Sequence, residues 1–182
     1  QGAVALCNTQ PFMRELGGRM HIFAHNGRLP GIEHVLPPGH RFRPVGGTDS
    51  EVAFCAMLDS LAPVWDAGSP AISRRLPPIA AIAAILRGLA PANFLYSDGE
   101  MLVAHAHRRT QQDGSIAPPG LWMLQRACSV DADVLAPAGV VLQQHQTVTL
   151  FASVPLSGEA GQPLDAGRIV VARHGSPLAC PV

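Results

Sequence analysis

The stretch TDSEVAFCAMLDSL, which begins at Thr48, constrains the fold more than any other part of the sequence. Thr48 and Glu51 have the spacing of a capping box, in which the first side chain accepts from a backbone N–H three residues on. Phe54, Leu58 and Leu61 follow at helical spacing and form one apolar stripe. This pattern predicts an amphipathic helix that must be buried against another layer of the domain.

Further along, the pattern predicts a second helix over 79–89, while Pro63 is expected to end the first. The segment 68–78 between them is rich in Gly, Ser and Pro and is predicted to be a linker. Arg74 and Arg75 lie in it and are expected to be a solvated basic pair.

Strand-like runs make up most of the remaining sequence. The run 19–27 ends in Asn26-Gly27, a strong turn signal, and 28–47 is predicted to be loop because it is dense in Pro and Gly. Residues 93–107 predict two strands joined at Asp98-Gly99, and further short runs follow at 120–127, 139–153 and 167–175. With helices first and antiparallel strands after them, the order favours a layered α+β domain over alternating βαβ units.

Composition limits what the chain can do. The 182 residues suffice for one well-buried domain, and hydrophobic residues make up 47%. Thirteen acidic residues balance thirteen basic ones, so neither nucleic acid nor an anionic membrane is an expected partner. All the basic residues are arginine, which excludes a lysine Schiff base and a Walker-type phosphate loop within these residues.

The four cysteines show no metal-binding spacing and no disulfide framework. We interpret them as buried or incidental thiols in a reducing compartment, and Cys7 as a small buried residue beside a turn. No apolar run reaches membrane-spanning length and no signal peptide is visible, which favours the cytoplasm. Because the chain starts at Gln1, we expect preceding residues to have been removed or to lie outside this sequence.

Three short polar clusters, 8–12, 25–27 and 46–51, are the candidates for a functional site. Each also has a purely structural interpretation, as a turn, a hairpin or a helix cap. His105 and His107 would share one face of a strand and could bind a metal, but no third ligand lies nearby in the sequence. A solvated strand end is the favoured interpretation of these two histidines, and no metal site is predicted.

The combination of clusters resembles the class II glutamine amidotransferases, which are N-terminal-nucleophile (Ntn) hydrolases, and most closely their stand-alone bacterial branch. Five motifs carry the resemblance in the family's order: Asn8–Phe12, Phe23–Gly27, Gly46–Glu51, Asn93–Gly99 and Ala152–Leu156. It implies an α+β fold of the four-layer αββα sandwich type, in which residues 1–182 are the larger, C-terminal part of one domain that lacks its N-terminal strands. It implies neither a cofactor nor a metal.

The resemblance also assigns roles to residues. Asn26 and Gly27 would form the oxyanion hole, where an amide N–H and a backbone N–H stabilise the charge that develops on a carbonyl oxygen. Asp49, with Thr48 beside it, would bind the α-amino group of glutamine or a γ-glutamyl substrate. The family's nucleophile is an N-terminal cysteine, which Gln1 cannot replace, and its usual carboxylate-binding arginine also lies upstream.

Three functions stay open on these grounds. The first is an amidohydrolase that forms a γ-glutamyl thioester on a cysteine in a segment outside this chain. It could act alone, for example on a γ-glutamyl conjugate as in ergothioneine synthesis, or supply ammonia to a separate synthase. The second is a non-catalytic amino-acid-binding or regulatory remnant of the same fold. In the third, all the motifs are turns and caps.

Overall fold

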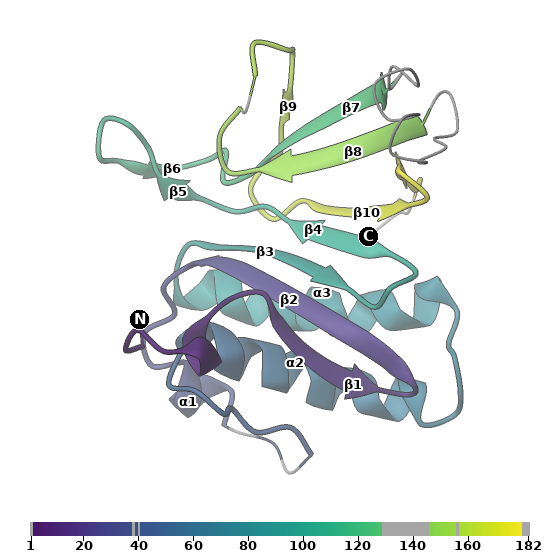
Figure 1. Cartoon of the computed structure of the whole chain (residues 1–182). Helices are drawn as coiled ribbons and strands as arrows, with labels where there is room; N and C mark the ends of the chain where they lie inside the picture. The colour runs from purple at the N-terminus through teal and green to yellow at the C-terminus, as the bar shows by residue number, and fades with distance from the viewer. Residues whose placement is uncertain (1, 38, 40, 129–145, 156, 180–182) are drawn as a thin grey trace, which may run out of the picture.

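The computed structural model describes residues 2–179 apart from 38, 40, 129–145 and 156 (Figure 1). A short 3₁₀ turn, Leu6–Asn8, precedes the first strand. The helices are α1 Ile32–Val35, α2 Asp49–Trp65 and α3 Ile72–Leu89. The strands are β1 Phe12–Leu16, β2 Arg19–Gly27, β3 Ala92–Ser97, β4 Leu102–His105, β5 Arg109–Thr110, β6 Ile116–Ala117, β7 Trp122–Cys128, β8 Gln146–Ala152, β9 Gln162–Pro163, β10 Ile169–Arg173 and β11 Ser176–Pro177.

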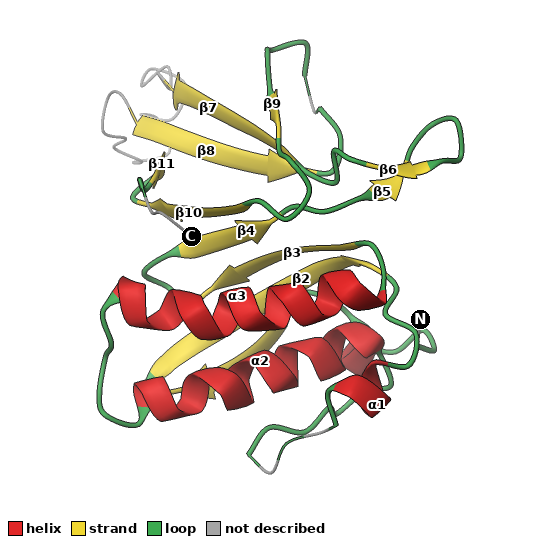
Figure 2. Cartoon of the chain, turned by 180° about the vertical axis from the view of Figure 1, so that it is seen from behind, coloured by secondary structure: helices red, strands yellow, loops and turns green. Residues whose placement is uncertain are grey.

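Six strands form the main sheet in the order β1-β2-β3-β4-β10-β11, with every neighbouring pair antiparallel. Helices α2 and α3 lie side by side across one face of it (Figure 2). A second sheet, ordered β8-β7-β9, lies next to the part of the main sheet formed by β4 and β10 (Figure 1). The predicted α+β class is confirmed, whereas the four-layer arrangement stays a prediction.

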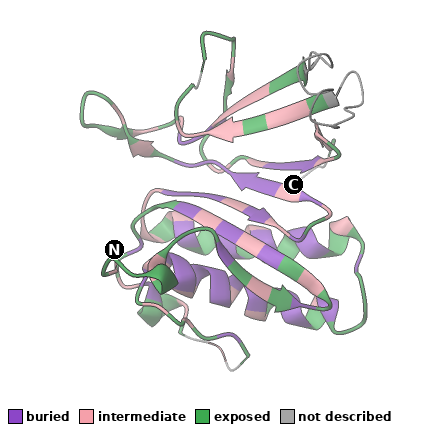
Figure 3. Cartoon of the chain, in the orientation of Figure 1, coloured by how far each residue is buried: buried purple, intermediate pink, exposed green. Residues whose placement is uncertain are grey.

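The main core lies between the sheet and α2. Phe54, Leu58 and Leu61, the predicted apolar stripe of this helix, are all fully buried (Figure 3). The Phe23 ring on β2 stacks on Phe54, and Phe94 on β3 packs against Phe23, both with ring centroids 5.4 Å apart. Burying aromatic rings of this size fixes the helix against the sheet that carries the candidate site.

Both helices are longer than predicted, because each contains proline at positions that were expected to lie outside it. Helix α2 continues through Pro63 to Trp65, whose side chain is buried. A proline removes only one backbone donor near the helix end, which the burial of a large aromatic side chain offsets. Likewise α3 begins at Ile72 and contains Pro77 and Pro78, so the predicted linker 68–78 is partly helical.

Arg75 explains this early start and corrects the prediction of a solvated basic pair. Its side chain is 2% exposed and donates to the Asp98 carboxylate, to Glu100 and to the Pro70 carbonyl, each at 2.8 Å. Its guanidinium also lies 4.9 Å from the Trp65 ring centroid. The first turn of α3 is therefore tied to α2 and to the β3–β4 turn by one buried cation.

The strand predictions are largely confirmed, and the hairpin at Asp98-Gly99 joins β3 to β4 as expected. Residues 139–145 of one predicted run lie outside the described residues. Strand β1 was not predicted, and the segment 28–47 contains the single-turn helix α1. Asn26-Gly27 is not a hairpin turn, since both residues are still paired with β3.

Of the two cysteines whose burial is described, Cys7 departs from the expectation of a buried thiol. Cys7 is exposed in the 3₁₀ turn, whereas Cys55 is buried in α2, where burial raises the pKa of its thiol to about 11. Among the described residues, no helix has both the length and the apolar character needed to cross a membrane.

Replacing Arg75 by alanine is expected to lower the free energy of unfolding by about 3–5 kcal/mol, because the Asp98 carboxylate would stay buried without its cation. Chemical denaturation measures this change. Arg74→Ala is the matched control, since Arg74 is exposed one residue earlier in the same turn, and its effect is expected to stay within about 0.5 kcal/mol. Equal effects of the two substitutions would contradict the structural role of Arg75.

Candidate active site

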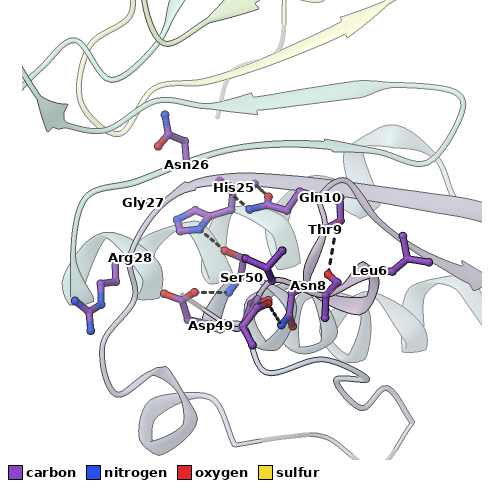
Figure 4. Close-up of a pocket in the computed structure, with 15 residues that line it drawn as sticks. Leu6, Asn8, Thr9, Gln10, His25, Asn26, Gly27, Arg28, Asp49 and Ser50 are labelled. Carbon is purple, nitrogen blue, oxygen red and sulfur yellow. Dashed lines mark hydrogen bonds between the residues drawn. The ribbon is translucent and has the colours of Figure 1, made fainter.

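An open pocket with a volume of about 820 Å³ lies where the end of β2 meets the start of α2 (Figure 4). It is lined by the four residues predicted for the site: Asn26, Gly27, Thr48 and Asp49. The end of β2 and the start of α2, which residues 28–47 separate in the sequence, therefore contribute to one cavity. The N-terminal segment 2–10 supplies much of the remaining wall.

Gly27 is the last residue of β2, and the backbone there admits no side chain. Its φ is 155°, and a Cβ atom would lie 2.3 Å from the Pro91 carbonyl oxygen and 2.8 Å from Nε2 of His25. Both contacts are closer than real Cβ contacts. Glycine is thus required by close packing under the strand end, not by a hairpin turn.

The side chain of Asn26 projects from the face of β2 opposite to that of His25, because successive side chains of a strand alternate. Its side-chain amide points towards the second sheet, where Nδ2 donates to Oγ of Ser153 at 2.9 Å. Asn26 also borders a smaller pocket of about 340 Å³ that contains Ser153. The amide has two N–H bonds, so one can serve Ser153 while the other serves a ligand.

The N-terminus of α2 supplies the acidic side of the pocket. Thr48 caps the helix, and its hydroxyl accepts from the Glu51 backbone N–H at 3.2 Å, as predicted. The Asp49 carboxylate accepts from the backbone N–H of Leu29 at 2.6 Å and of Ser50 at 3.0 Å. These bonds hold Asp49 at the pocket wall and fix the chain as it leaves β2.

Glu51 fixes the loop in front of the helix. Its carboxylate is 1% exposed and accepts from the backbone N–H of Val45 at 3.0 Å and of Gly46 at 2.7 Å. Arg14 on β1 makes an ion pair with the same group. The Thr48 half of the predicted capping box is therefore observed, whereas the Glu51 side chain bonds to the preceding loop and to β1.

His25 connects the two sides of the pocket. Its Nδ1 lies 2.9 Å from Oγ of Ser50, and both residues are buried. Burial lowers the pKa of His25 to about 4, although the nearby Asp49 carboxylate acts in the opposite direction. The ring is therefore neutral near pH 7 and acts as a hydrogen-bonding link between β2 and α2.

His105 and His107 correct the expectation of a solvated strand end, since both are buried. His105 stacks on Phe94 with ring centroids 4.9 Å apart, and its Nε2 lies 3.2 Å from the Arg87 guanidinium. Burial and Arg87 lower the pKa of His105 to about 4. Within the described ranges, no three His, Cys, Asp or Glu side chains form a group that could hold a metal.

Sequence reasoning missed several residues that build the site. Gln10, Ser50 and Ser153 lie inside the quoted motifs but were assigned no role. Ser50 could have been found from its place beside Asp49 in the first turn of a predicted helix. Gln10 and Ser153 are brought to β2 from opposite ends of the chain, and no local pattern predicts that.

Taken together, the pocket offers a fixed carboxylate on one side and N–H donors on the other. A carboxylate beside a helix start can bind an ammonium group. Amide and backbone N–H groups can stabilise a carbonyl oxygen as it becomes negatively charged. The arrangement suits a ligand that carries an amine at one end and a carboxamide or carboxylate at the other.

These features agree with the similarity of the whole chain to known proteins. The family of class II glutamine amidotransferases matches residues 1–181, and the chain belongs to that family. Its Ntn-hydrolase fold is what the family implies for this α+β domain.

The individual relatives are longer than this chain. The candidate glutamine amidotransferase YafJ of Escherichia coli (strain K12) is 37% identical over 87% of this chain and 59% of its own length. A candidate glutamine amidotransferase of Haemophilus influenzae is 30% identical over 98% of this chain and 58% of its own length. The crystal structure of a predicted glutamine amidotransferase from Pseudomonas aeruginosa superposes with a TM-score of 0.76 and 29% identity, covering 96% of this chain and 66% of that one.

Gly27→Ala is expected to lower the free energy of unfolding by more than about 2 kcal/mol, because the new Cβ would collide with the Pro91 carbonyl at a strained φ. Thermal or chemical denaturation measures this change in the free energy of unfolding. Gly88→Ala is the matched control: it lies in α3 with open space around it, and alanine there is expected to stabilise by up to about 1 kcal/mol. A neutral Gly27→Ala would contradict the packing described.

The free energy of unfolding is expected to fall as the pH drops from about 6.5 to about 4. In that range His25 and His105 bind protons in the unfolded chain but not in the folded one. Each of them lowers the free energy of unfolding by about 1.4 kcal/mol for every unit that the pH falls. Denaturation at a series of pH values measures the slope. His105→Gln should make this slope shallower, and a slope that is unchanged in the variant would contradict the buried neutral state of His105.

Proposed function

We propose that this chain forms the substrate pocket of an enzyme that hydrolyses the side-chain amide of glutamine or of a γ-glutamyl compound. The observation that carries the proposal is the meeting of Asn26 and Gly27 with Asp49 at one cavity. Membership of the amidotransferase family supports it independently.

In the proposed mechanism, Asp49 binds the α-ammonium group and Thr48 fixes the helix start that carries it. The side-chain carbonyl of the substrate then points towards Asn26 and Gly27. A cysteine thiol, supplied by a segment outside this chain, adds to that carbonyl carbon, and the charge that develops on the oxygen is stabilised by the Asn26 amide and the Gly27 N–H.

Collapse of this tetrahedral intermediate, with the thiol proton passed to the amide nitrogen, expels ammonia and leaves a γ-glutamyl thioester. Water then adds to the thioester, the thiol leaves, and glutamate is released. Neutral His25 and its partner Ser50 hold the strand and helix in register while these steps occur. Ammonia either diffuses away or passes to a separate synthase.

We further propose that the segment carrying the cysteine completes the four-layer sandwich. Met13 and Met20 are 54% and 51% exposed on the open face of β1 and β2, opposite the helices. Ile22 lies directly across from Met13 on the same face. An apolar strip of this kind suits a covering strand layer, and the curated relatives are long enough to contain one.

In the full-length protein, Asn26→Ala is expected to lower kcat for glutamine hydrolysis by about 100-fold or more, since it removes an oxyanion donor. Asp49→Asn is expected to act mainly on KM, raising it by about 10-fold or more, since a charged hydrogen bond is lost. Ammonia release under steady-state conditions measures both.

The matched control for the second variant is Asp66→Asn, which changes an exposed carboxylate paired only with the exposed Arg41 among the described residues. It should leave both constants unchanged. A wild-type protein that binds glutamate but releases no ammonia would instead favour the non-catalytic binding remnant. If Asn26→Ala and Asp49→Asn cost only about 1 kcal/mol of stability and change no activity or binding, the motifs are turns and caps.

A further inference from the structure

The end of β2 that carries the proposed oxyanion hole is paired on one edge only. On the β3 side, pairing continues to Asn26↔Asn93 and beyond. On the other side, β1 pairs with β2 only as far as Phe12↔Phe23. A strand end held along one edge has fewer bonds to fix its direction than one held along both.

Gln10 occupies the empty edge with its side chain. Its Nε2 donates to the His25 carbonyl at 3.0 Å, and its Oε1 accepts from the His25 N–H. One carboxamide therefore makes the two bonds that a residue on a neighbouring antiparallel strand would make. Figure 4 shows Gln10 reaching His25 from the 3₁₀ turn side of the pocket.

The His25 ring is held at the same time from the helix. Ser50 contacts Nδ1 at 2.9 Å, and the backbone N–H of Ser50 donates to Asp49 at 3.0 Å. His25 is thus fixed through its backbone by Gln10 and through its ring by Ser50. Because Asn26 and Gly27 follow His25 directly in the chain, the position of the His25 backbone sets their orientation.

We propose that Gln10 is a positioning residue for amide hydrolysis. By holding the His25 backbone, its carboxamide sets the direction of the Asn26 amide and the Gly27 N–H relative to Asp49. The inference rests on the proposed function and goes beyond it, because Gln10 acts through His25 and not on the substrate. A small displacement of such donors is costly, since oxyanion stabilisation depends on their preorganised geometry.

The first test is Gln10→Ala in the full-length protein. We expect kcat for glutamine hydrolysis to fall by about 10- to 100-fold while KM changes by less than about 3-fold, because the amine site at Asp49 is untouched. Gln125→Ala is the matched control, since Gln125 is an exposed glutamine on β7, and it should leave kcat unchanged. Wild-type kcat in Gln10→Ala would overturn the proposal.

The second test is Gln10→Glu, which keeps the shape of the side chain but removes the donor to the His25 carbonyl. A protonated carboxyl has one O–H donor and one acceptor oxygen, which are the two roles that the amide plays towards His25, so protonation restores the pair of bonds. The ratio of variant to wild-type kcat should therefore rise as the pH falls towards the ordinary glutamate pKa of about 4.3. A ratio that is constant with pH would contradict the bonding role, and Gln125→Glu should give a constant ratio near unity.

A wild-type protein that releases no ammonia would defeat the proposed function, and the positioning role is then decided without activity. Hydrogen exchange of the Asn26 and Gly27 backbone amides, followed by NMR, measures how firmly the strand end is held. Faster exchange in Gln10→Ala than in the wild type, with Gln125→Ala unchanged, supports the role of Gln10. Equal exchange in all three proteins overturns it.

Discussion

The rest of the site depends on the bonds that the buried carboxylate of Glu51 makes. This carboxylate satisfies the Val45 and Gly46 backbone N–H groups and pairs with Arg14, so it joins a loop, a strand and a helix at one point. Because a buried carboxylate without such partners would be costly, the three elements cannot separate independently. The start of α2, with Asp49 and Ser50, is thereby held against β1, and β1 is in turn paired with β2.

From that junction the geometry of the pocket follows. Asp49 is fixed by the Leu29 N–H at one end of its carboxylate, while Ser50 extends to His25. Gly27 fits above the Pro91 carbonyl only because it lacks a side chain. The pocket is therefore assembled from groups that are each held by hydrogen bonds or close packing. Fixed positions of this kind are the condition for electrostatic stabilisation without reorganisation.

The sequence predicted the elements that depend on local patterns. The cap at Thr48, the apolar stripe of α2 and the hairpin at Asp98-Gly99 follow from residue spacing and turn chemistry, and all three are observed. The meeting of Asn26 with Asp49 was predicted only through the family resemblance. What could not be predicted depends on long-range contacts: a buried Arg75 that extends α3, and Gln10 serving as a strand partner.

The proposed function depends on the orientation of an amino acid in this pocket, and a crystal structure of the full-length protein with L-glutamate measures that orientation directly. We expect the α-ammonium group within hydrogen-bond distance of the Asp49 carboxylate. We also expect a γ-carboxylate oxygen within about 2.7–3.1 Å of both Nδ2 of Asn26 and the Gly27 backbone nitrogen. Glutamate bound in the reverse orientation, or at a site that excludes Asp49, would contradict the proposed function.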